Sequence, residues 1–165
     1  MSNKCVNDRI QTHLGLSESD LKSAAEIVQR CLGATYVLFV KTQNYHWNVT
    51  GPQFISLHEL FEAQYQEYVA AVDDMAERIR QFGFFVPAHF AAFQSSDLIQ
   101  EENGFPSAQD MLQHLMQDNI ALSSLLRESI VQLESMSADP ATIDMLTDRM
   151  AVHEKNAWML RAHLS

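Results

Sequence analysis

The stretch FISLHELFEAQYQEYVAAVDDMAERI, residues 54–79, carries an apolar side chain at every third or fourth position. An α-helix completes a turn in about 3.6 residues, so this spacing places the apolar side chains on one face. That face consists of Phe54, Leu57, Phe61, Tyr65, Tyr68, Val72, Ala76 and Ile79. The stretch therefore predicts a long amphipathic helix that packs against other helices.

Helix-breaking residues divide the rest of the chain. The 165 residues include only 5 Gly and 4 Pro, and most of these lie at Gly51-Pro52, within 83–106 and at Asp139-Pro140. We expect helices from about residue 20 to 49, from Pro52 to the break at Gly83, from 107 to about 135, and from 139 to the C-terminus, none of which is interrupted by proline beyond its first turn. The sequence shows no strand alternation and no hairpin turn.

Residues at the helix starts support these boundaries. Ser17 or Ser19 is expected to cap the first helix, and Ser107 the third. Pro52 suits the first turn of the second helix, and Asp139 reads as an ordinary N-cap of the fourth. The long connection between the second and third helices is expected to hold a short helix within PAHFAAFQSSD, residues 87–97.

Four helices with two short connections and one long crossover are typical of a ferritin-like bundle. The predicted fold class is therefore all-α, a ferritin-like four-helix bundle with a short extra helix between helices two and three. We expect one domain over residues 17–165 and a short tail over residues 1–16.

The charge balance limits the classes of partner. The chain has 11 Lys and Arg against 21 Asp and Glu, a formal net charge of −10. Binding to nucleic acid or to an anionic membrane needs a surplus of basic residues, whereas an acidic chain suits cations. The two cysteines, Cys5 and Cys31, and the lack of a signal-like apolar run lead us to expect a cytoplasmic protein with no membrane span.

Four ionisable residues of the second helix share one side of it: His58, Glu62, Asp73 and Glu77. They fall within about 100° around the helix axis, beside the apolar face. Imidazole and carboxylate ligands suit Fe(II), Mn(II) or Zn(II). The alternative interpretation is that these residues are ordinary i,i+4 neighbours on a solvent-exposed face and bind no metal. Spacing alone does not decide between the two interpretations.

Distance constrains how such a site is built. His46, at the end of the preceding helix, is expected to lie near His58 after the turn at Gly51-Pro52. His58 and Asp73 lie roughly 22 Å apart along a straight helix, too far for one metal ion. If the residues form one site, Asp73 and Glu77 must meet the histidines of a second subunit in an antiparallel two-fold pair.

The run HWNVTGPQFISLHELFEAQYQEYVAAVDDMAERI, residues 46–79, resembles the signature of the Dps family (DNA-binding proteins from starved cells, or mini-ferritins). The segment HEKNAWMLR, residues 153–161, resembles the last helix of that family. The similarity in helix order covers nearly the whole chain and is weakest over residues 1–16 and 84–105. The Glu-x-x-His pair of the larger ferritins is absent.

The resemblance implies an iron-oxidising centre between two subunits. The two histidines of the family map to His46 and His58, and the acidic pair from the partner maps to Asp73 and Glu77. A further ligand, commonly Asp in the family, falls on Glu62, and the extra methylene puts the second iron position in doubt. Trp47 matches an aromatic residue thought to accept an electron or quench a radical, or it packs at the subunit contact.

The resemblance further implies a hollow dodecamer with acidic pores. Asp139, Asp144 and Asp148 match the positions of the pore aspartates. Glu59, beside His58, is expected to face the cavity and to nucleate mineral.

We therefore expect a ferroxidase that stores and detoxifies iron. It would oxidise Fe(II) with hydrogen peroxide, or more slowly with O2, and keep Fe(III) mineral in a shell, which protects DNA indirectly. The main alternative is a nucleoid-associated shell protein whose DNA contact matters more than its oxidation chemistry. A third possible function is that of a helical assembly or adhesion protein whose metal site is degenerate. Direct DNA binding is not expected, because residues 1–16 contain only Lys4 and Arg9 as basic residues and the C-terminus has no basic tail.

Overall fold

Serine caps fix the starts of two of the long helices. The computed structural model describes residues 12, 14–93, 98–136 and 139–164. Helix α1 spans Glu18–Asn48, and the Ser17 Oγ at its start accepts a hydrogen bond from the Asp20 backbone N–H at 3.1 Å. Helix α4 spans Ala108–Glu134, and Ser107 accepts from the Asp110 N–H at 3.2 Å. Both predicted caps are confirmed, with Ser17 rather than Ser19 as the first.

The other two long helices start differently from the prediction. Helix α2 spans Phe54–Gln81, so Pro52 lies in the preceding turn and not in the first helical turn. Gly51 has a positive φ of 114°, and the Phe54 N–H bonds to its carbonyl, which closes this turn before the helix begins. Helix α5 spans Pro140–Ala162 behind Asp139, but the Asp139 carboxylate makes no capping bond to the helix.

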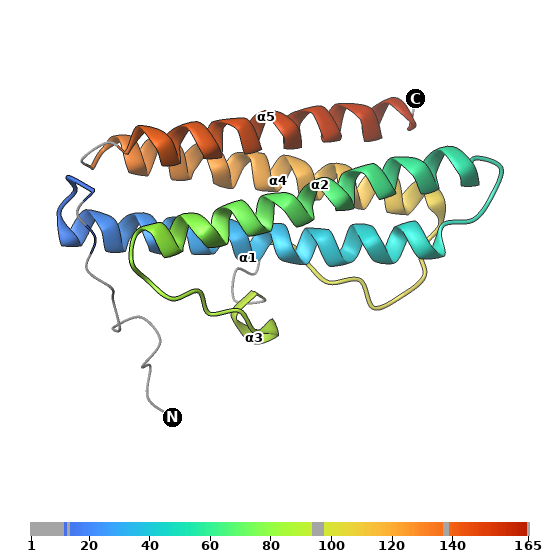
Figure 1. The fold of residues 1–165 in the computed structure, drawn as a ribbon. Coiled ribbons are helices and arrows are strands. Elements are labelled where there is room, and N and C mark those ends of the chain that lie inside the picture. Colours follow the sequence, from blue (N-terminus) through green and yellow to red (C-terminus); the bar gives the residue numbers. More distant parts are fainter. Residues whose placement is uncertain (1–11, 13, 94–97, 137–138, 165) are drawn as a thin grey trace.

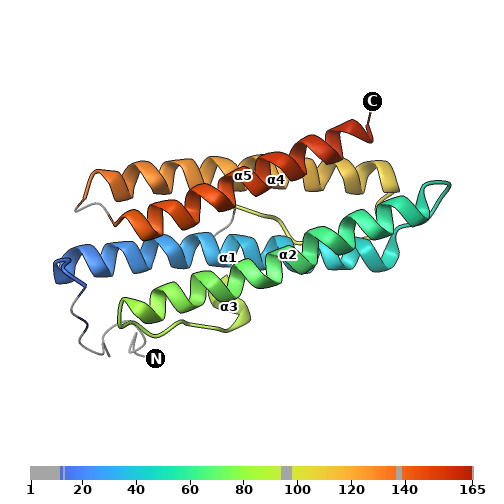
Figure 2. The same cartoon turned by 45° about the horizontal axis from the view of Figure 1, so that its top comes forward.

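The four long helices form two antiparallel pairs. In Figures 1 and 2, α1 runs beside α2 and α4 beside α5, and the two pairs pack on each other. The long connection between α2 and α4 crosses the bundle and holds the short helix α3, Phe90–Phe93. Helix α3 packs closely on α1, because a Cβ atom added at Gly33 would lie only 3.1 Å from the Phe93 carbonyl. This is the expected ferritin-like bundle with an extra helix.

Parts of the predicted organisation lie outside the described residues. They are residues 1–11 and 13 of the expected tail, residues 94–97 of the expected short helix, and residues 137–138, 165. Among the residues described, we find five helices and no strand. None of the helices in this described part combines the length and apolar character needed to cross a membrane.

The apolar face of α2 forms much of the core. Leu57, Phe61, Tyr68 and Ile79 are all less than 3% exposed, as the spacing predicts. Tyr65, Val72 and Ala76 of the predicted face are only half-buried. Phe54 is 39% exposed, because it lies at the first residue of the helix, beyond the end of the core.

A buried polar network ties the two helix pairs together across the core. The Tyr68 hydroxyl on α2 donates to the Asn119 Oδ1 on α4 at 2.9 Å, and the His153 Nδ1 on α5 lies 2.8 Å from the same oxygen. Asn156 donates to the Tyr68 oxygen at 3.0 Å. Since an amide oxygen only accepts, the His153 Nδ1 carries a hydrogen. Burial, reinforced by the charge of Arg149, lowers the pKa of His153 to about 3, so this imidazole is neutral.

The buried His153 predicts a loss of stability in mild acid. An imidazole in the unfolded chain takes up a proton below about pH 6.5, whereas the folded one does so only near pH 3. We expect the free energy of unfolding to fall by about 2 kcal/mol from this residue between pH 7 and pH 5. Urea unfolding followed by circular dichroism at both pH values measures it.

His153→Asn is the matched variant, because its amide keeps a donor toward Asn119 and does not titrate. It is expected to be less stable at pH 7 but to lose much less stability on acidification than the unsubstituted protein. If the free energy of unfolding fell equally in the two proteins between pH 7 and pH 5, His153 would not be the neutral, buried imidazole described above.

Candidate metal centre

Two histidines meet where α1 turns into α2. His46 lies in the last turn of α1 and is 6% exposed, and His58 lies in the second turn of α2 and is half-buried. The turn at Gly51 returns the chain so that the imidazole rings stack, with centroids 3.8 Å apart and planes 21° apart. The predicted proximity of His46 and His58 is thus present in the structure.

Each of these histidines hydrogen-bonds the backbone of the other. The His46 Nδ1 lies 2.9 Å from the His58 carbonyl oxygen, and the His58 Nδ1 lies 2.8 Å from the His46 carbonyl oxygen. A carbonyl only accepts, so both Nδ1 atoms carry hydrogens, and in the neutral rings both Nε2 atoms keep a lone pair. These two hydrogen bonds fix the orientation of each ring and the position of its Nδ1 hydrogen, as is common for histidines that bind metal through Nε2.

Aromatic side chains enclose the stacked pair on both sides. The Phe54 ring lies 5.1 Å from the His58 ring, and the Tyr65 ring meets the His46 ring edge-on at 5.2 Å. These contacts are in the usual range for aromatic packing and limit rotation of the two imidazoles. The site is therefore preorganised by α1 and α2 of one chain.

The candidate carboxylates are distributed along α2. Glu62, one turn after His58, is half-buried and accepts a hydrogen bond from Gln66 at 3.3 Å. Asp73 and Glu77 are exposed and lie one turn apart, far along the helix from His58. Within the described part of the chain, no three His, Cys, Asp or Glu side chains gather closely enough to hold a metal ion.

The acidic pair on α2 has no charged partner in its own chain among the residues described. The two nearby arginines are engaged elsewhere: Arg78 bonds Asp139, and Arg80 bonds the Phe84 carbonyl. Two carboxylates one turn apart repel each other. Asp73 and Glu77 therefore form an uncompensated negative site on the surface.

Two further predicted residues, Trp47 and Glu59, lie on the surface. Trp47 is 66% exposed, and Glu59 is exposed next to His58. A tryptophan with so large an exposed fraction is typical of a residue at a protein–protein interface, since aromatic side chains are enriched there.

The three candidate pore acids occupy different environments. Asp144 and Asp148 are exposed one turn apart on α5. Asp139 is 8% exposed and accepts hydrogen bonds from Arg78 at 2.6 Å and from the Thr142 hydroxyl. Burial opposes its ionisation, but the Thr142 and Arg78 hydrogen bonds and the Arg78 charge outweigh this and lower the pKa of Asp139. Asp139 thus holds the expected N-cap position of α5, but its carboxylate joins α2 to α5 instead of capping the helix backbone.

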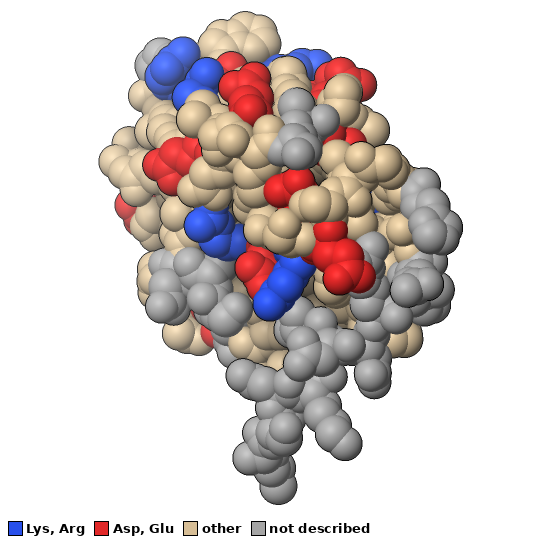
Figure 3. Space-filling model, turned by 90° about the vertical axis from the view of Figure 1, so that its left-hand side faces the viewer, with Lys and Arg blue, Asp and Glu red and all other residues tan. Residues whose placement is uncertain are grey.

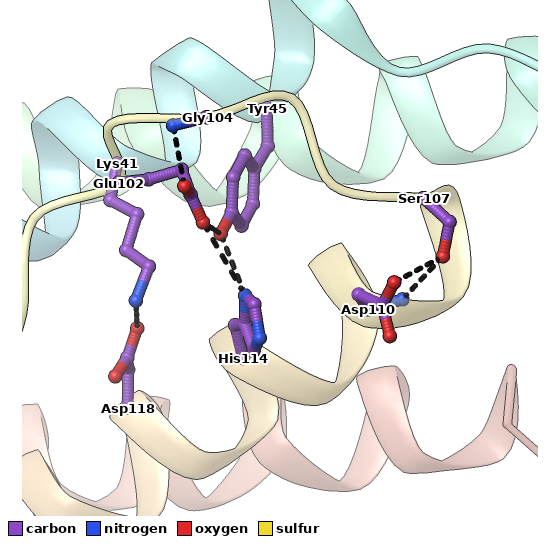
Figure 4. Close-up of polar contacts among 8 residues, drawn as sticks. All are labelled: Lys41, Tyr45, Glu102, Gly104, Ser107, Asp110, His114 and Asp118. Carbon is purple, nitrogen blue, oxygen red and sulfur yellow. Dashed lines mark hydrogen bonds and ion pairs between the residues drawn. The ribbon is translucent and has the colours of Figure 1, made fainter.

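A polar cluster next to the histidines was not anticipated from the sequence. Figure 4 shows Tyr45, Glu102 and His114 converging from α1, the α3–α4 connection and α4. The Tyr45 hydroxyl donates to Glu102 at 2.9 Å and lies 2.9 Å from the His114 Nδ1. Burial, with the hydrogen bond and charge of Glu102, raises the pKa of Tyr45, while the Gly104 N–H and then Tyr45 lower the pKa of Glu102. Because Tyr45 precedes His46, the cluster anchors the end of α1.

An ion pair strengthens the same region. Lys41 on α1 lies 2.7 Å from Asp118 on α4, and both side chains are largely buried (Figure 4). Burial raises the pKa of Asp118 in spite of the Lys41 charge and hydrogen bond. No local spacing rule relates residues so far apart in the chain, so the sequence offered no signal for this pair.

Comparisons with known proteins identify the family of the chain. A family model for the ferritin-like domain matches residues 25–165. A DNA protection during starvation protein of Brevibacillus brevis is 37% identical over 140 residues, which cover 85% of this chain and 93% of that protein.

Solved structures match over nearly the full chain. A Dps protein from Bacillus brevis is 35% identical, with a TM-score of 0.85 and coverage of 94% of this chain and 100% of that one. A Dps protein from Vibrio cholerae, described as a member of a broad superfamily of ferritin-like diiron-carboxylate proteins, is 25% identical, with a TM-score of 0.87 and coverage of 94% and 98%. By its ferritin-like domain and by these relatives, the chain belongs to the Dps family.

Proposed function

We propose that this protein is a cytoplasmic ferroxidase that stores and detoxifies iron. It oxidises Fe(II), with hydrogen peroxide as the main oxidant and O2 as a slower one, and keeps the Fe(III) mineral in a hollow shell. The observation that carries the proposal is the His46–His58 pair, because each ring uses its Nδ1 to bond a backbone carbonyl and so leaves its Nε2 as the ligand atom for an incoming ion.

The remaining ligands come from a second copy of the chain. His46, His58 and Glu62 of one subunit meet Asp73 and Glu77 of the partner subunit in an antiparallel two-fold pair, which creates two sites per dimer. Two observations support the split. Among the described residues, no third metal-binding side chain lies close enough to complete a site with His46 and His58, and no cationic side chain pairs with the acidic pair on α2.

The ligand set suits iron as the substrate. Neutral imidazoles and carboxylates bind Fe(II), and the carboxylates compensate the charge that rises when iron is oxidised. The Vibrio cholerae relative is placed among diiron-carboxylate proteins, which favours one or two iron ions at each site here. Peroxide consumed in this reaction no longer forms hydroxyl radicals, so DNA is protected indirectly.

The assembly we propose is a dodecamer. Asp144 and Asp148, exposed on α5, would line pores for Fe(II) together with Asp139, whose charge is already paired with Arg78. Glu59, exposed beside His58, would nucleate the mineral. Light scattering on the purified protein measures whether its particles contain twelve chains of 18.8 kDa.

Complementation between two defective variants tests the split site. His58→Ala and Asp73→Ala are each expected to abolish rapid Fe(II) oxidation by peroxide at low iron-to-protein ratio. Dissociating the two variants, mixing them in equal amounts and reassembling them should restore about a quarter of the unsubstituted activity, because each mixed dimer regains one intact site.

Asp74→Ala is the control for that experiment, because Asp74 is an exposed acid beside Asp73 that we place outside the site. It should oxidise iron at the normal rate. Mixed oligomers as inactive as their two parents would show that the ligands come from one chain and would exclude the intersubunit centre.

A nucleoid-associated role is the second candidate, and the name of the Brevibacillus brevis relative, a DNA protection protein, favours testing it. The net charge of −10 opposes direct binding. Figure 3 shows the end of the bundle where α1 and α5 begin, and among the described residues of this face acidic and basic side chains are interspersed, with no continuous basic surface.

Gel shifts over a salt series separate the two functions. We expect no complex with duplex DNA at physiological salt in the presence of a chelator, and weak binding at most when Mg²⁺ bridges the acids. Tight binding with a steep salt dependence and without divalent ions would favour the DNA-binding role.

A further inference from the structure

A row of aromatic rings leads away from the candidate iron centre. It begins at His46, passes through Tyr65 of α2 and Phe39 of α1, and reaches Tyr36 of α1 and Phe93 of α3. Successive ring centroids are 5.2, 6.3, 5.7 and 4.2 Å apart. The row thus joins a proposed metal ligand to two tyrosines through ring contacts.

Tyrosine differs from the other members of this row because it can be oxidised by one electron at moderate potential, whereas phenylalanine resists oxidation. Electron transfer also slows steeply with distance, so a tyrosine in contact with a ligand ring is well placed to react first. Tyr65 and Tyr36 are both partly exposed, so solvent reaches part of each side chain.

The electron balance of the proposed reaction creates a need for such a donor. Hydrogen peroxide takes up two electrons when it forms water, and one Fe(II) supplies one. By the family resemblance, Glu62 stands where Asp is common, and this puts the second iron position in doubt. A site that holds a single Fe(II) must therefore obtain the second electron from the protein, or it releases a hydroxyl radical.

We propose that Tyr65 is this second donor, an inference that rests on the ferroxidase function proposed above. One H2O2, one Fe(II), the Tyr65 hydroxyl and one proton give Fe(III), a neutral Tyr65 radical and two waters. The O–H bond of Tyr65 breaks, its electron passes through the His46 ring contact, and its proton leaves to water. Tyr36 then reduces the Tyr65 radical through Phe39, which moves the radical away from the iron.

Trp47 is the competing donor, since the family resemblance assigns this role to it. Its side chain is 66% exposed, and no ring contact joins it to His46 in the part of the chain that the structure describes. Tyr65, in contrast, meets the His46 ring at 5.2 Å. The geometry therefore favours Tyr65 over Trp47 in this protein.

Freeze-quench electron paramagnetic resonance tests the proposal. The assembled protein is loaded anaerobically with one Fe(II) per subunit and mixed with one equivalent of peroxide. We expect a tyrosyl radical whose yield falls several-fold in Tyr65→Phe, while hydroxyl radical captured by a spin trap rises. Fe(II) binding, measured by titration, should be retained because the phenyl ring preserves the packing against His46.

Three variants make the assignment specific. Tyr45→Phe removes another tyrosine near the site that lies outside the row, and Trp47→Phe removes the competing donor; both should keep the tyrosyl signal. Tyr36→Phe should leave the radical on Tyr65 and prolong it.

An unchanged radical yield in Tyr65→Phe, or a signal lost in Trp47→Phe instead, would overturn the assignment. Wild-type protein that oxidises iron without any protein radical would overturn the Tyr65 proposal alone. Wild-type protein that does not oxidise iron at all would overturn the ferroxidase function as well.

Discussion

The reciprocal hydrogen bonds between His46 and His58 are the interaction on which the site depends. Each ring donates to the backbone carbonyl of the other, so the end of α1 and the start of α2 are locked together by the residues that would bind metal. Loss of either imidazole would remove a proposed ligand and also one of the two hydrogen bonds that join the helices here. Site and fold are therefore coupled at this turn.

A second constraint is the length of α2. The helix is straight enough in Figure 1 that its first and last turns cannot contact one ion, and this separates the histidines from Asp73 and Glu77 within one chain. The isologous pair that we propose would resolve the separation without any change of fold, because each subunit would offer the half-site that the other lacks. In that assembly, Asp73 and Glu77, which add to the acidic net charge, would serve as metal ligands.

Local sequence rules predicted the helices and many of the candidate residues. The apolar period of α2, the serine caps of α1 and α4 and the residues beside the Gly51 turn depend on neighbours a few positions away, so they are visible in one sequence. Contacts between distant segments were not visible. The Asp139–Arg78 pair, the Tyr45–Glu102 bond and the Tyr65–His46 contact join different helices or connections, and no spacing rule relates their members. The Asp139 carboxylate was misread for this reason.

The central claim is that two subunits share each iron centre, and crystallography with anomalous scattering at the iron edge tests it most directly. Crystals of the assembled protein would be soaked briefly in Fe(II) without oxygen. We expect an iron peak beside the His46 and His58 Nε2 atoms of one subunit and the carboxylates of Asp73 and Glu77 of the partner subunit. Iron bound by residues of a single chain, within the bundle core, would contradict it.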